Sequence, residues 1–361
     1  MRSRLQLRRH PSDTGVGRMN RRRRLNDEVI TMAHGAGGMS SAALFEAVFA
    51  PALANPALDA REDGAVLDLP PGRLVVSTDS FVVRPRHFPG GSVGSLAVHG
   101  TINDLAAMGA EPIALTAAFV IEEGLAIAEL RLLVTDLAGA AAAAGVPVVA
   151  GDTKVVESGA ADGVYITTTG IGVIPPGRPT LSVDAVRVGD AVLVSGNLGD
   201  HGIAVLLARG DLALEADVVS DSAALHGLAA ALLDAVPTVR WMRDPTRGGL
   251  ASALNELVEL CGLSVELDES AIPVQPAVSG ASELLGLDPL YIANEGRLVA
   301  VVAAAEAPDA LAVWRSHPLG LGSAIIGRIT ADPAGMVIGR TGFGGTRVID
   351  LLVGDPLPRI C

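Results

Sequence analysis

The chain has few of the residues that stabilise small secreted proteins or membrane proteins. Its 361 residues include two cysteines, Cys261 and Cys361, and aromatic side chains make up only 3%. Two cysteines are too few for a disulfide framework, so we expect Cys261 to pack as a small apolar residue in a protein of the reducing cytoplasm. The most apolar region, residues 126–149, is interrupted by charged side chains and falls short of the roughly 18 apolar residues of a membrane span. These absences predict a protein without a membrane segment.

Lysine is almost absent as well. Of the 27 basic residues, 26 are arginine, and Lys154 is the sole lysine. A chain that uses arginine for ordinary positive charge is expected to retain lysine where a compact ammonium group cannot be replaced by a planar guanidinium. Lys154 is therefore a candidate catalytic residue, and the alternative is chance retention of one lysine.

Charge is distributed unevenly along the chain. The first 24 residues contain nine arginines and one acidic residue, whereas the remainder contains 18 basic and 39 acidic residues. The strong excess of acidic residues in this remainder argues against nucleic-acid binding as the main function. No apolar stretch follows the arginines, so they do not form a secretory or twin-arginine signal. We expect residues 1–29 to be a disordered head, or to include translated sequence upstream of a later start such as Met19.

The rest of the chain alternates strand and helix patterns, which predicts an α/β fold of the α+β type with two domains. The proline- and glycine-rich segment 174–179 is the clearest linker. We therefore expect an N-terminal α/β domain over 30–175, a C-terminal α/β domain over 176–346 and an extended, mobile tail over 347–361. Strands are expected at 74–77, 113–120, 148–150, 163–173, 191–195, 264–267, 298–304 and 323–329, and helices at 41–50, 94–108, 126–144, 201–208, 223–235 and 249–260.

Three aspartates of the first domain stand beside expected strand ends or turns. Asp79 and Asp152 each follow an expected strand, and Asp104 lies in the segment GTINDL. Carboxylates at such positions contact ligands and metals in α/β sheets, and their hard oxygens suit Mg²⁺ together with substrate phosphates. Each aspartate alone could be a turn or cap residue. The three together predict a site for magnesium and phosphate.

Two glycine-containing loops could contribute to the same site. The segment HGAGG at 34–38 precedes an expected helix, although it is not a Walker loop. Residues 243–249 combine Asp244, Arg247 and Gly248 at a helix start, where backbone N–H groups and guanidinium groups bind phosphate. Glu295 precedes an expected strand and could be a base or lie in a solvated turn. The seven histidines show no pairing with cysteine at zinc-ligand spacing.

The last residue of the sequence is a cysteine. A thiol there has no following chain to pack it, and Pro356 and Pro358 favour an extended approach. This predicts an acceptor arm that visits more than one active site. The alternative is a tail that happens to end in cysteine.

These motifs, in this order, resemble those of the HypE family of hydrogenase maturation proteins, within the ATP-binding superfamily typified by aminoimidazole ribonucleotide synthetase. The resemblance runs from residue 31 to residue 361. The aspartate motifs indicate ATP chemistry in general, whereas the terminal PRIC is specific to the family. The matching segments are HGAGG, STDSFVVRP, FPGGSVGSLAVHGTINDLAAMGA, GDTKVV, SGNLGDHGIA, MRDPTRGGLASALNEL, LLGLDPLYIANEGRL and LPRIC.

The resemblance implies two domains of the aminoimidazole ribonucleotide synthetase type, usually paired in a homodimer, that use ATP and Mg²⁺. It further implies that a HypF-type carbamoyltransferase loads a carbamoyl group onto the sulfur of Cys361. The tail then enters the ATP site, where phosphorylation of the amide oxygen and loss of phosphate leave a thiocyanate. The cyanide is passed to iron held by a HypC–HypD complex, on the way to a nickel–iron hydrogenase.

The residues present fit such a reaction. Charge near the transferring phosphoryl group and the carboxamide must be neutralised, for which we predict Lys154, and the amide N–H needs a base, for which we predict Glu295. The thiol must ionise, and we expect Arg359 to assist. The expected Mg²⁺ ligands are Asp79, Asp104, Asp152 and Asp244, and the expected ATP contacts are these four with Gly35, Gly37, Gly38, Asn103, Thr153, Arg247 and Gly248.

Other functions are compatible with part of the pattern. A selenophosphate synthetase would be expected to carry a reactive cysteine near its N-terminus, and this chain has none before Cys261. A thiamine-monophosphate kinase would have no use for a terminal thiol. A non-catalytic carbamoyl carrier would need neither the aspartates nor Lys154, and it would show no ATP hydrolysis that depends on Cys361.

Overall fold

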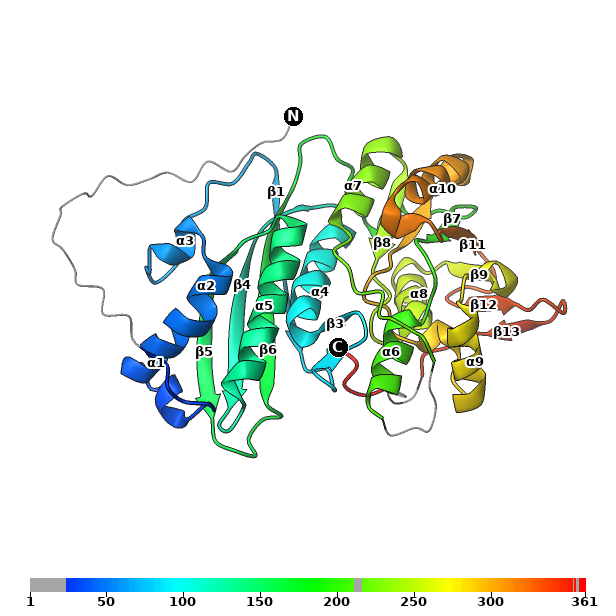
Figure 1. Ribbon diagram of the computed structural model, residues 1–361. Helices are drawn as coiled ribbons and strands as arrows, with labels where there is room; N and C mark the ends of the chain where they lie inside the picture. Colours follow the sequence, from blue (N-terminus) through cyan, green and yellow to red (C-terminus); the bar gives the residue numbers. More distant parts are fainter. Residues whose placement is uncertain (1–23, 211–215, 353, 355–356) are drawn as a thin grey trace.

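The structure of the protein, a computed structural model, describes residues 24–210, 216–352, 354 and 357–361. It contains two large sheets that lie side by side, each with helices packed on it, and the C-terminal end lies between them (Figure 1). Most of the expected head lies outside the described residues. Its last two residues belong to the first domain. The carbonyl oxygen of Glu28 accepts a hydrogen bond from the Ile127 N–H at 2.9 Å, and Val29 forms a β-bridge with Ala126. The expected disordered head therefore does not extend to residue 29.

The first sheet has four strands in the order β1-β6-β4-β5, of which only β4 and β5 pair in parallel. Helix α4 packs on β1, β6 and β4, and helix α5 packs on α4. The alanine-rich α5 ends where Gly145 adopts a φ of 71°, a left-handed conformation that glycine adopts without strain. The elements are β1 (Arg73–Phe81), β4 (Glu111–Glu122), β5 (Val148–Val156), β6 (Val164–Ile174), α4 (Val93–Ala107) and α5 (Ile127–Ala144).

Short elements surround this sheet. The N-terminal ones pack along α5 and the edge strand β5, and the hairpin of β2 and β3 leads into α4. They are η1 (Met32–Gly35), α1 (Met39–Leu44), the π-helix η2 (Phe45–Phe49), α2 (Ala50–Leu53), α3 (Pro56–Asp59), β2 (His87–Phe88) and β3 (Gly91–Ser92).

The second sheet has seven strands in the order β13-β12-β9-β11-β7-β10-β8. Its central strands β7 and β10 are buried on both faces, because α8 covers one face and α7 and α10 cover the other. Cys261 ends α8 and packs against this core, as expected. No helix of the described chain is long and apolar enough to cross a membrane. The elements are β7 (Ala191–Val194), α6 (Asp200–Ala208), α7 (His226–Ala235), β8 (Val239–Arg243), α8 (Gly249–Cys261), β9 (Ser264–Asp268), α9 (Pro276–Leu285), β10 (Val299–Val302), α10 (Ala307–Ser316), β11 (Ala324–Thr330), β12 (Val337–Arg340) and β13 (Thr346–Val348).

Several elements differ from the expectation. Strands β1 and β5 continue beyond their expected ends, so Asp79 and Asp152 lie within strands. Asp104 lies within α4, which matches the helix expected at 94–108. In β1 the extension is stabilised by hydroxyl pairs with β6, such as Ser80 Oγ to Thr167 Oγ1 at 2.7 Å. The elements β8, β12, β13, α9 and α10 were not predicted. Because β13 includes residue 347, the first residues of the expected tail lie in the sheet.

The contact between α4 and α5 depends on a glycine. A Cβ atom at Gly94 would lie 2.1 Å from the Leu133 carbonyl oxygen, whereas a Cβ at Gly139 would meet nothing within 4 Å. We therefore expect Gly94→Ala to destabilise the protein by about 1–3 kcal/mol through overpacking. The matched change Gly139→Ala should stabilise it by about 0.5–1 kcal/mol, since alanine favours a helix interior. Urea unfolding of the two variants measures both effects, and equal destabilisation would contradict the proposed close contact.

Candidate active site

A cavity of about 300 Å³ lies where the two sheets meet. Side chains from β1, α4, the segments before α8 and β10, and the C-terminal tail line it. Six of the residues predicted from sequence come together here although they are distant in the chain, namely Asp79, Asp104, Asp244, Arg247, Glu295 and Cys361.

The N-terminal domain provides one wall of the cavity. Asp79 lies on β1, and α4 carries Gly100 and Asp104 four residues apart, on the same helix face. The Ser77 hydroxyl donates a hydrogen bond to the Asp104 carboxylate. Gly100 allows the close approach of this helix, because a Cβ there would lie 2.9 Å from the Phe81 ring and 3.8 Å from Oε2 of Glu295.

The C-terminal domain provides the opposite wall. Asp244 follows β8 directly and is 9% exposed, and Arg247 lies in the turn that starts α8. This turn requires a left-handed residue before the helix, which Gly248 supplies with a φ of 77°. Glu295 is 2% exposed and precedes β10.

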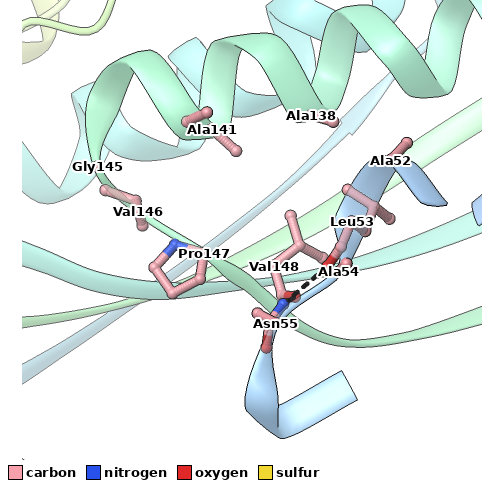
Figure 2. A pocket seen from close by; sticks show the side chains of 11 residues that line it. Ala52, Leu53, Ala54, Asn55, Ala138, Ala141, Gly145, Val146, Pro147 and Val148 are labelled. Atoms are coloured by element: carbon pink, nitrogen blue, oxygen red, sulfur yellow. Dashed lines mark hydrogen bonds between the residues drawn. The ribbon is translucent and has the colours of Figure 1, made fainter. Parts of the chain in front are cut away.

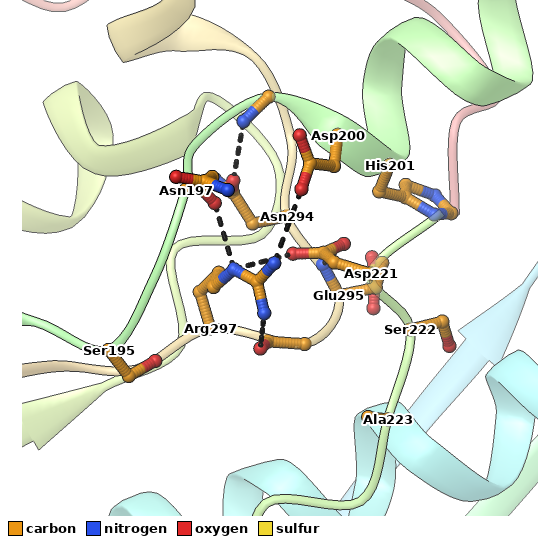
Figure 3. A network of polar contacts seen from close by, with 12 residues as sticks. Ser195, Asn197, Asp200, His201, Asp221, Ser222, Ala223, Asn294, Glu295 and Arg297 are labelled. Atoms are coloured by element: carbon orange, nitrogen blue, oxygen red, sulfur yellow. Dashed lines mark hydrogen bonds and ion pairs between the residues drawn. The ribbon is translucent and has the colours of Figure 1, made fainter. Parts of the chain in front are cut away.

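A buried polar network fixes the position of Glu295 (Figure 3). The Asp221 carboxylate accepts a hydrogen bond from the Glu295 N–H at 3.1 Å. Arg297 in turn pairs with Asp221 at 3.5 Å and with Asp200 at 3.2 Å, and its Nε donates to the carbonyl oxygen of Asn197. Two buried carboxylates thus share one guanidinium group directly behind the cavity.

The cavity strongly favours protonated acids. Burial, followed by the charge of Asp104, raises the pKa of Asp79 to about 6, and the same two causes raise the pKa of Asp244 to about 7. The pKa of Glu295 lies well above its usual value, first through burial and then through the charge of Asp244. Acids held this close repel one another when ionised, and a bound cation would relieve that repulsion.

The thiol of Cys361 lies among these acids. Burial and the charge of Glu295 raise its pKa to about 11, opposed by Arg247. Nη2 of Arg247 lies 3.3 Å from the sulfur. The expectation that Arg359 assists the thiol is wrong, because the Arg359 guanidinium pairs with Asp162 at 2.6 Å. Arg247 is the cation at the sulfur.

The tail is docked in this structure, where the sequence predicted mobility. The backbone of residues 359–361 runs antiparallel to residues 82–84, which follow β1. The Val82 N–H donates to the Cys361 carbonyl oxygen at 3.2 Å, and the Arg84 N–H donates to the Arg359 carbonyl oxygen at 3.1 Å. The tail therefore pairs with the segment that continues β1, beyond the edge of the first sheet.

This position separates Cys361 from Lys154. Lys154 and Asp152 lie on β5 at the opposite edge of the sheet, and strands β1, β6 and β4 lie between β5 and the tail. Four interstrand steps of about 4.7–4.9 Å give a separation of about 19–20 Å. Nζ of Lys154 pairs with Asp152 Oδ2 at 2.5 Å, and both side chains are about two-thirds exposed. Within one chain, Lys154, Asp152 and Thr153 do not reach the cavity.

The remaining predicted contacts lie elsewhere. Gly35 packs against β5, since a Cβ there would lie 2.9 Å from Cβ of Val155, and the N–H of Gly37 already donates to Ser41 Oγ at 2.9 Å. Gly38 precedes α1, beside this same edge. Asn103 is fully buried and bonds the carbonyls of Ala223 and Glu295 and the N–H of Leu225. Asn103 therefore joins the two domains and does not line the cavity.

Several lining residues were not predicted, namely Thr78, Ser80, Phe81, Gly100 and Thr246. Of these, Thr78, Ser80 and Phe81 lie within the STDSFVVRP motif, which could have been used to find them. A different hollow, of about 250 Å³, lies between α2 and the end of α5 (Figure 2). Its described lining consists of apolar side chains and Asn55, whose Nδ2 donates to the Val148 carbonyl oxygen at 2.8 Å. It provides no acid or base for chemistry.

The chain is similar to known proteins over nearly its whole length. The N-terminal domain of AIR synthase related proteins matches residues 61–174, and the C-terminal domain matches residues 187–340. Carbamoyl dehydratase HypE of Azotobacter vinelandii is 54% identical over 337 residues, which are 93% of this chain and 98% of the relative.

Solved structures agree with this similarity. The crystal structure of hydrogenase maturation protein HypE in complex with ATP matches with a TM-score of 0.87 and 44% identity, over 91% of this chain and 99% of the other. A chain of the HypE–HypF complex matches with a TM-score of 0.75 and 43% identity, over 86% of this chain and 100% of the other. A thiamine-monophosphate kinase from Stenotrophomonas maltophilia shares the fold, with a TM-score of 0.60 and 22% identity over 80% of this chain and 97% of the other.

The environment of the thiol predicts its pH dependence. In a Cys261→Ala background, alkylation of Cys361 by iodoacetamide should keep accelerating up to about pH 11, because burial disfavours the thiolate. Arg247→Ala should move the rate profile to higher pH by removing the cation at the sulfur. Arg340→Ala, which breaks a surface ion pair with Glu266, is the control and should change nothing. Intact mass follows the reaction, and a plateau near the pH of an exposed thiol would contradict the docked position.

Proposed function

The chain belongs to the HypE family of hydrogenase maturation proteins, and we propose that it is an ATP-dependent carbamoyl dehydratase whose substrate is carried on its own Cys361. The product is a thiocyanate that supplies the cyanide ligand of a nickel–iron hydrogenase. The observation that supports this most is a thiol placed among acids in a cavity between the two domains. A non-catalytic carrier needs no such cavity, and a kinase of small molecules has no reason to place its own thiol there.

The proposed reaction removes the elements of water from an S-carboxamide. The carboxamide oxygen attacks the γ-phosphorus of ATP and ADP leaves. The nitrogen then releases its two protons, the carbon–oxygen bond breaks, and the oxygen departs with phosphate. The sulfur keeps a C≡N group, so ATP and the carboxamide become ADP, phosphate and the thiocyanate.

Glu295 is positioned to accept the proton from nitrogen. Its carboxylate faces Gly100 and the cavity, and Oε1 has no hydrogen-bond partner among the described residues. Because burial raises its pKa well above the usual value, the ionised form is a stronger base than an exposed carboxylate. The network of Asp221 and Arg297 keeps its backbone in place.

The donor set of the cavity fits Mg²⁺ bound together with ATP phosphates. Asp79, Asp104 and Asp244 offer hard oxygens, and no three His, Cys, Asp or Glu side chains in the described part of the chain form a complete metal site. Mg²⁺ commonly uses one or two carboxylates plus phosphates and water. When bound, it would neutralise charge on the transferring phosphoryl group. Arg247 would contribute positive charge beside the sulfur.

A homodimer would supply the lysine that the cavity lacks within one chain. The side chains of β1 that point away from α4 are exposed, including Leu74 at 57% and Val76 at 58%, and Asp152 and Lys154 lie on the same open face of the sheet. Exposed apolar side chains on a sheet face favour burial against another surface. Thr78 and Ser80 lie on this open face and also line the cavity. We therefore propose that two such faces pair, and that Lys154 of one chain serves the Cys361 site of the other.

The partners follow from the chemistry that precedes and follows dehydration. We propose that a HypF-type carbamoyltransferase loads Cys361 and that iron in a HypC–HypD complex accepts the cyanide. Family membership supports both partners. A free reactive thiol at the end of the chain requires a reducing compartment, so we propose the cytoplasm.

Intact mass spectrometry tests the reaction. With the carbamoyltransferase, carbamoyl phosphate and Mg-ATP, the protein should gain a carbamoyl group and then become one water lighter. Cys361→Ala should gain nothing, and Cys261→Ala should behave as the wild type. Glu295→Gln should load normally but dehydrate 10²–10⁴-fold more slowly, roughly the contribution of a general base. An adduct that never loses water would identify a carrier, and no adduct would exclude the proposal.

Mixed dimers test the role of Lys154. Lys154→Ala and Cys361→Ala homodimers should both be inactive in dehydration. Dimers re-formed from equal amounts of both should recover about a quarter of the wild-type rate, because half are mixed and each mixed dimer has one complete site. Lys154→Arg should bind ATP without dehydrating. No recovery on mixing would show that Lys154 does not act across an interface, and activity of Lys154→Arg would exclude the need for an ammonium group.

A further inference from the structure

The docked tail is bound through its backbone. The carbonyl oxygens of its last four residues, 358 to 361, all accept hydrogen bonds. Two apolar side chains anchor it, because Leu357 is 5% exposed and Ile360 is 2% exposed. Beyond the pairing with residues 82–84, three side chains outside the cavity contact the tail, namely Arg209, His201 and Asp162.

Arg209 is the first of these side chains. It follows α6, and its Nη2 donates to the carbonyl oxygens of Pro358 and Arg359, the latter at 3.1 Å. Its Nε donates to the carbonyl oxygen of Arg84 at 3.0 Å. One guanidinium group therefore ties the tail to the segment along which it lies.

His201 and Asp162 are the other two. His201 is fully buried on α6, and burial lowers its pKa, so the neutral ring donates from Nε2 to the Ile360 carbonyl oxygen and accepts from Ser220 Oγ at Nδ1, both at 2.8 Å. Asp162 lies between β5 and β6 and pairs with Arg359 at 2.6 Å. This ion pair is partly exposed, with 41% of the Asp162 side chain and 36% of the Arg359 side chain accessible.

The contacts of these three residues given above do not involve the sulfur. The residues bind carbonyl groups and Arg359, so the same docked position is available whether the sulfur is free, carbamoylated or bears a nitrile. The thiol itself lies inside the cavity. A separate enzyme that modifies it must therefore receive a withdrawn tail, and withdrawal breaks these contacts.

We propose that Arg209, His201 and Asp162 are positioning residues that stabilise the docked tail. They thereby set the division of Cys361 between the withdrawn position, where it is loaded, and the docked position, where dehydration takes place. The docking half of this proposal rests on the contacts alone. The division between two reactions rests on the proposed function. Weakening the contacts should therefore have opposite effects on the two steps, which a general loss of stability would not produce.

Alkylation of Cys361 tests docking independently of catalysis. In a Cys261→Ala background at neutral pH, Arg209→Ala should raise the rate of iodoacetamide modification about tenfold, the effect of losing one to two hydrogen bonds. Asp162→Asn should raise it about two- to threefold, since a partly exposed ion pair contributes little. Arg315→Ala removes a guanidinium bonded to the Ser323 carbonyl far from the tail, and Asp234→Asn breaks a similar ion pair with Arg178, so both serve as matched controls.

The two enzymatic steps test the division. By intact mass, Arg209→Ala should load its carbamoyl group at least as fast as the wild type and lose water about tenfold more slowly, and Arg209→Lys should recover part of the loss. His201→Gln, which retains a donor at the position of Nε2, should be milder than His201→Leu. Alkylation rates equal to those of the controls would overturn the proposed docking role. Faster alkylation with unchanged dehydration would overturn the division alone, whereas failure of the wild type to dehydrate would overturn the proposed function.

Discussion

The crowding of acidic side chains between the two sheets is the constraint on which this structure depends. Asp79, Asp104, Asp244 and Glu295 surround a cavity that water does not fully screen, so burial and mutual repulsion raise the pKa values of three of them. Holding them together costs free energy that the rest of the fold must supply. Both domains contribute, because α4 packs on the first sheet and also contacts α7 and β8.

The alternation of side chains along a strand explains why the predicted site residues lie on two opposite faces of the first sheet. Asp79 points toward α4 and the cavity, whereas Lys154 and Asp152 occupy the opposite face of the same sheet. A strand places successive residues on opposite faces, and β1 and β5 are the two edges of the sheet. No movement of a side chain within one chain can reverse this, so the proposed role of Lys154 requires a second copy of the chain.

The terms that favour the docked tail and those that favour its release are similar in free energy. Burying Leu357 and Ile360 contributes about 1.5–3 kcal/mol each, and ordering five backbone residues costs about 1–2 kcal/mol per residue. Apolar anchoring alone therefore does not stabilise the docked state. Hydrogen bonds to the tail carbonyls, at about 0.5–1.5 kcal/mol each, decide the balance. A segment of this kind can enter the cavity and leave it again, as an acceptor that serves two enzymes must.

Sequence alone determined much of this protein. Many of the strands and helices, the aspartate motifs, Arg247, Glu295 and the terminal cysteine were recognisable, because periodicity and motif composition are local properties of the chain. The sole lysine, Lys154, could also be recognised in the sequence, but its position in the fold could not be predicted. Strand order, the face on which a residue lies and the partner of each guanidinium are set by contacts between distant segments. Only the tertiary structure could therefore assign Arg247 to the thiol, Arg359 to Asp162 and Asn103 to the domain contact, and separate Lys154 from Cys361 within one chain.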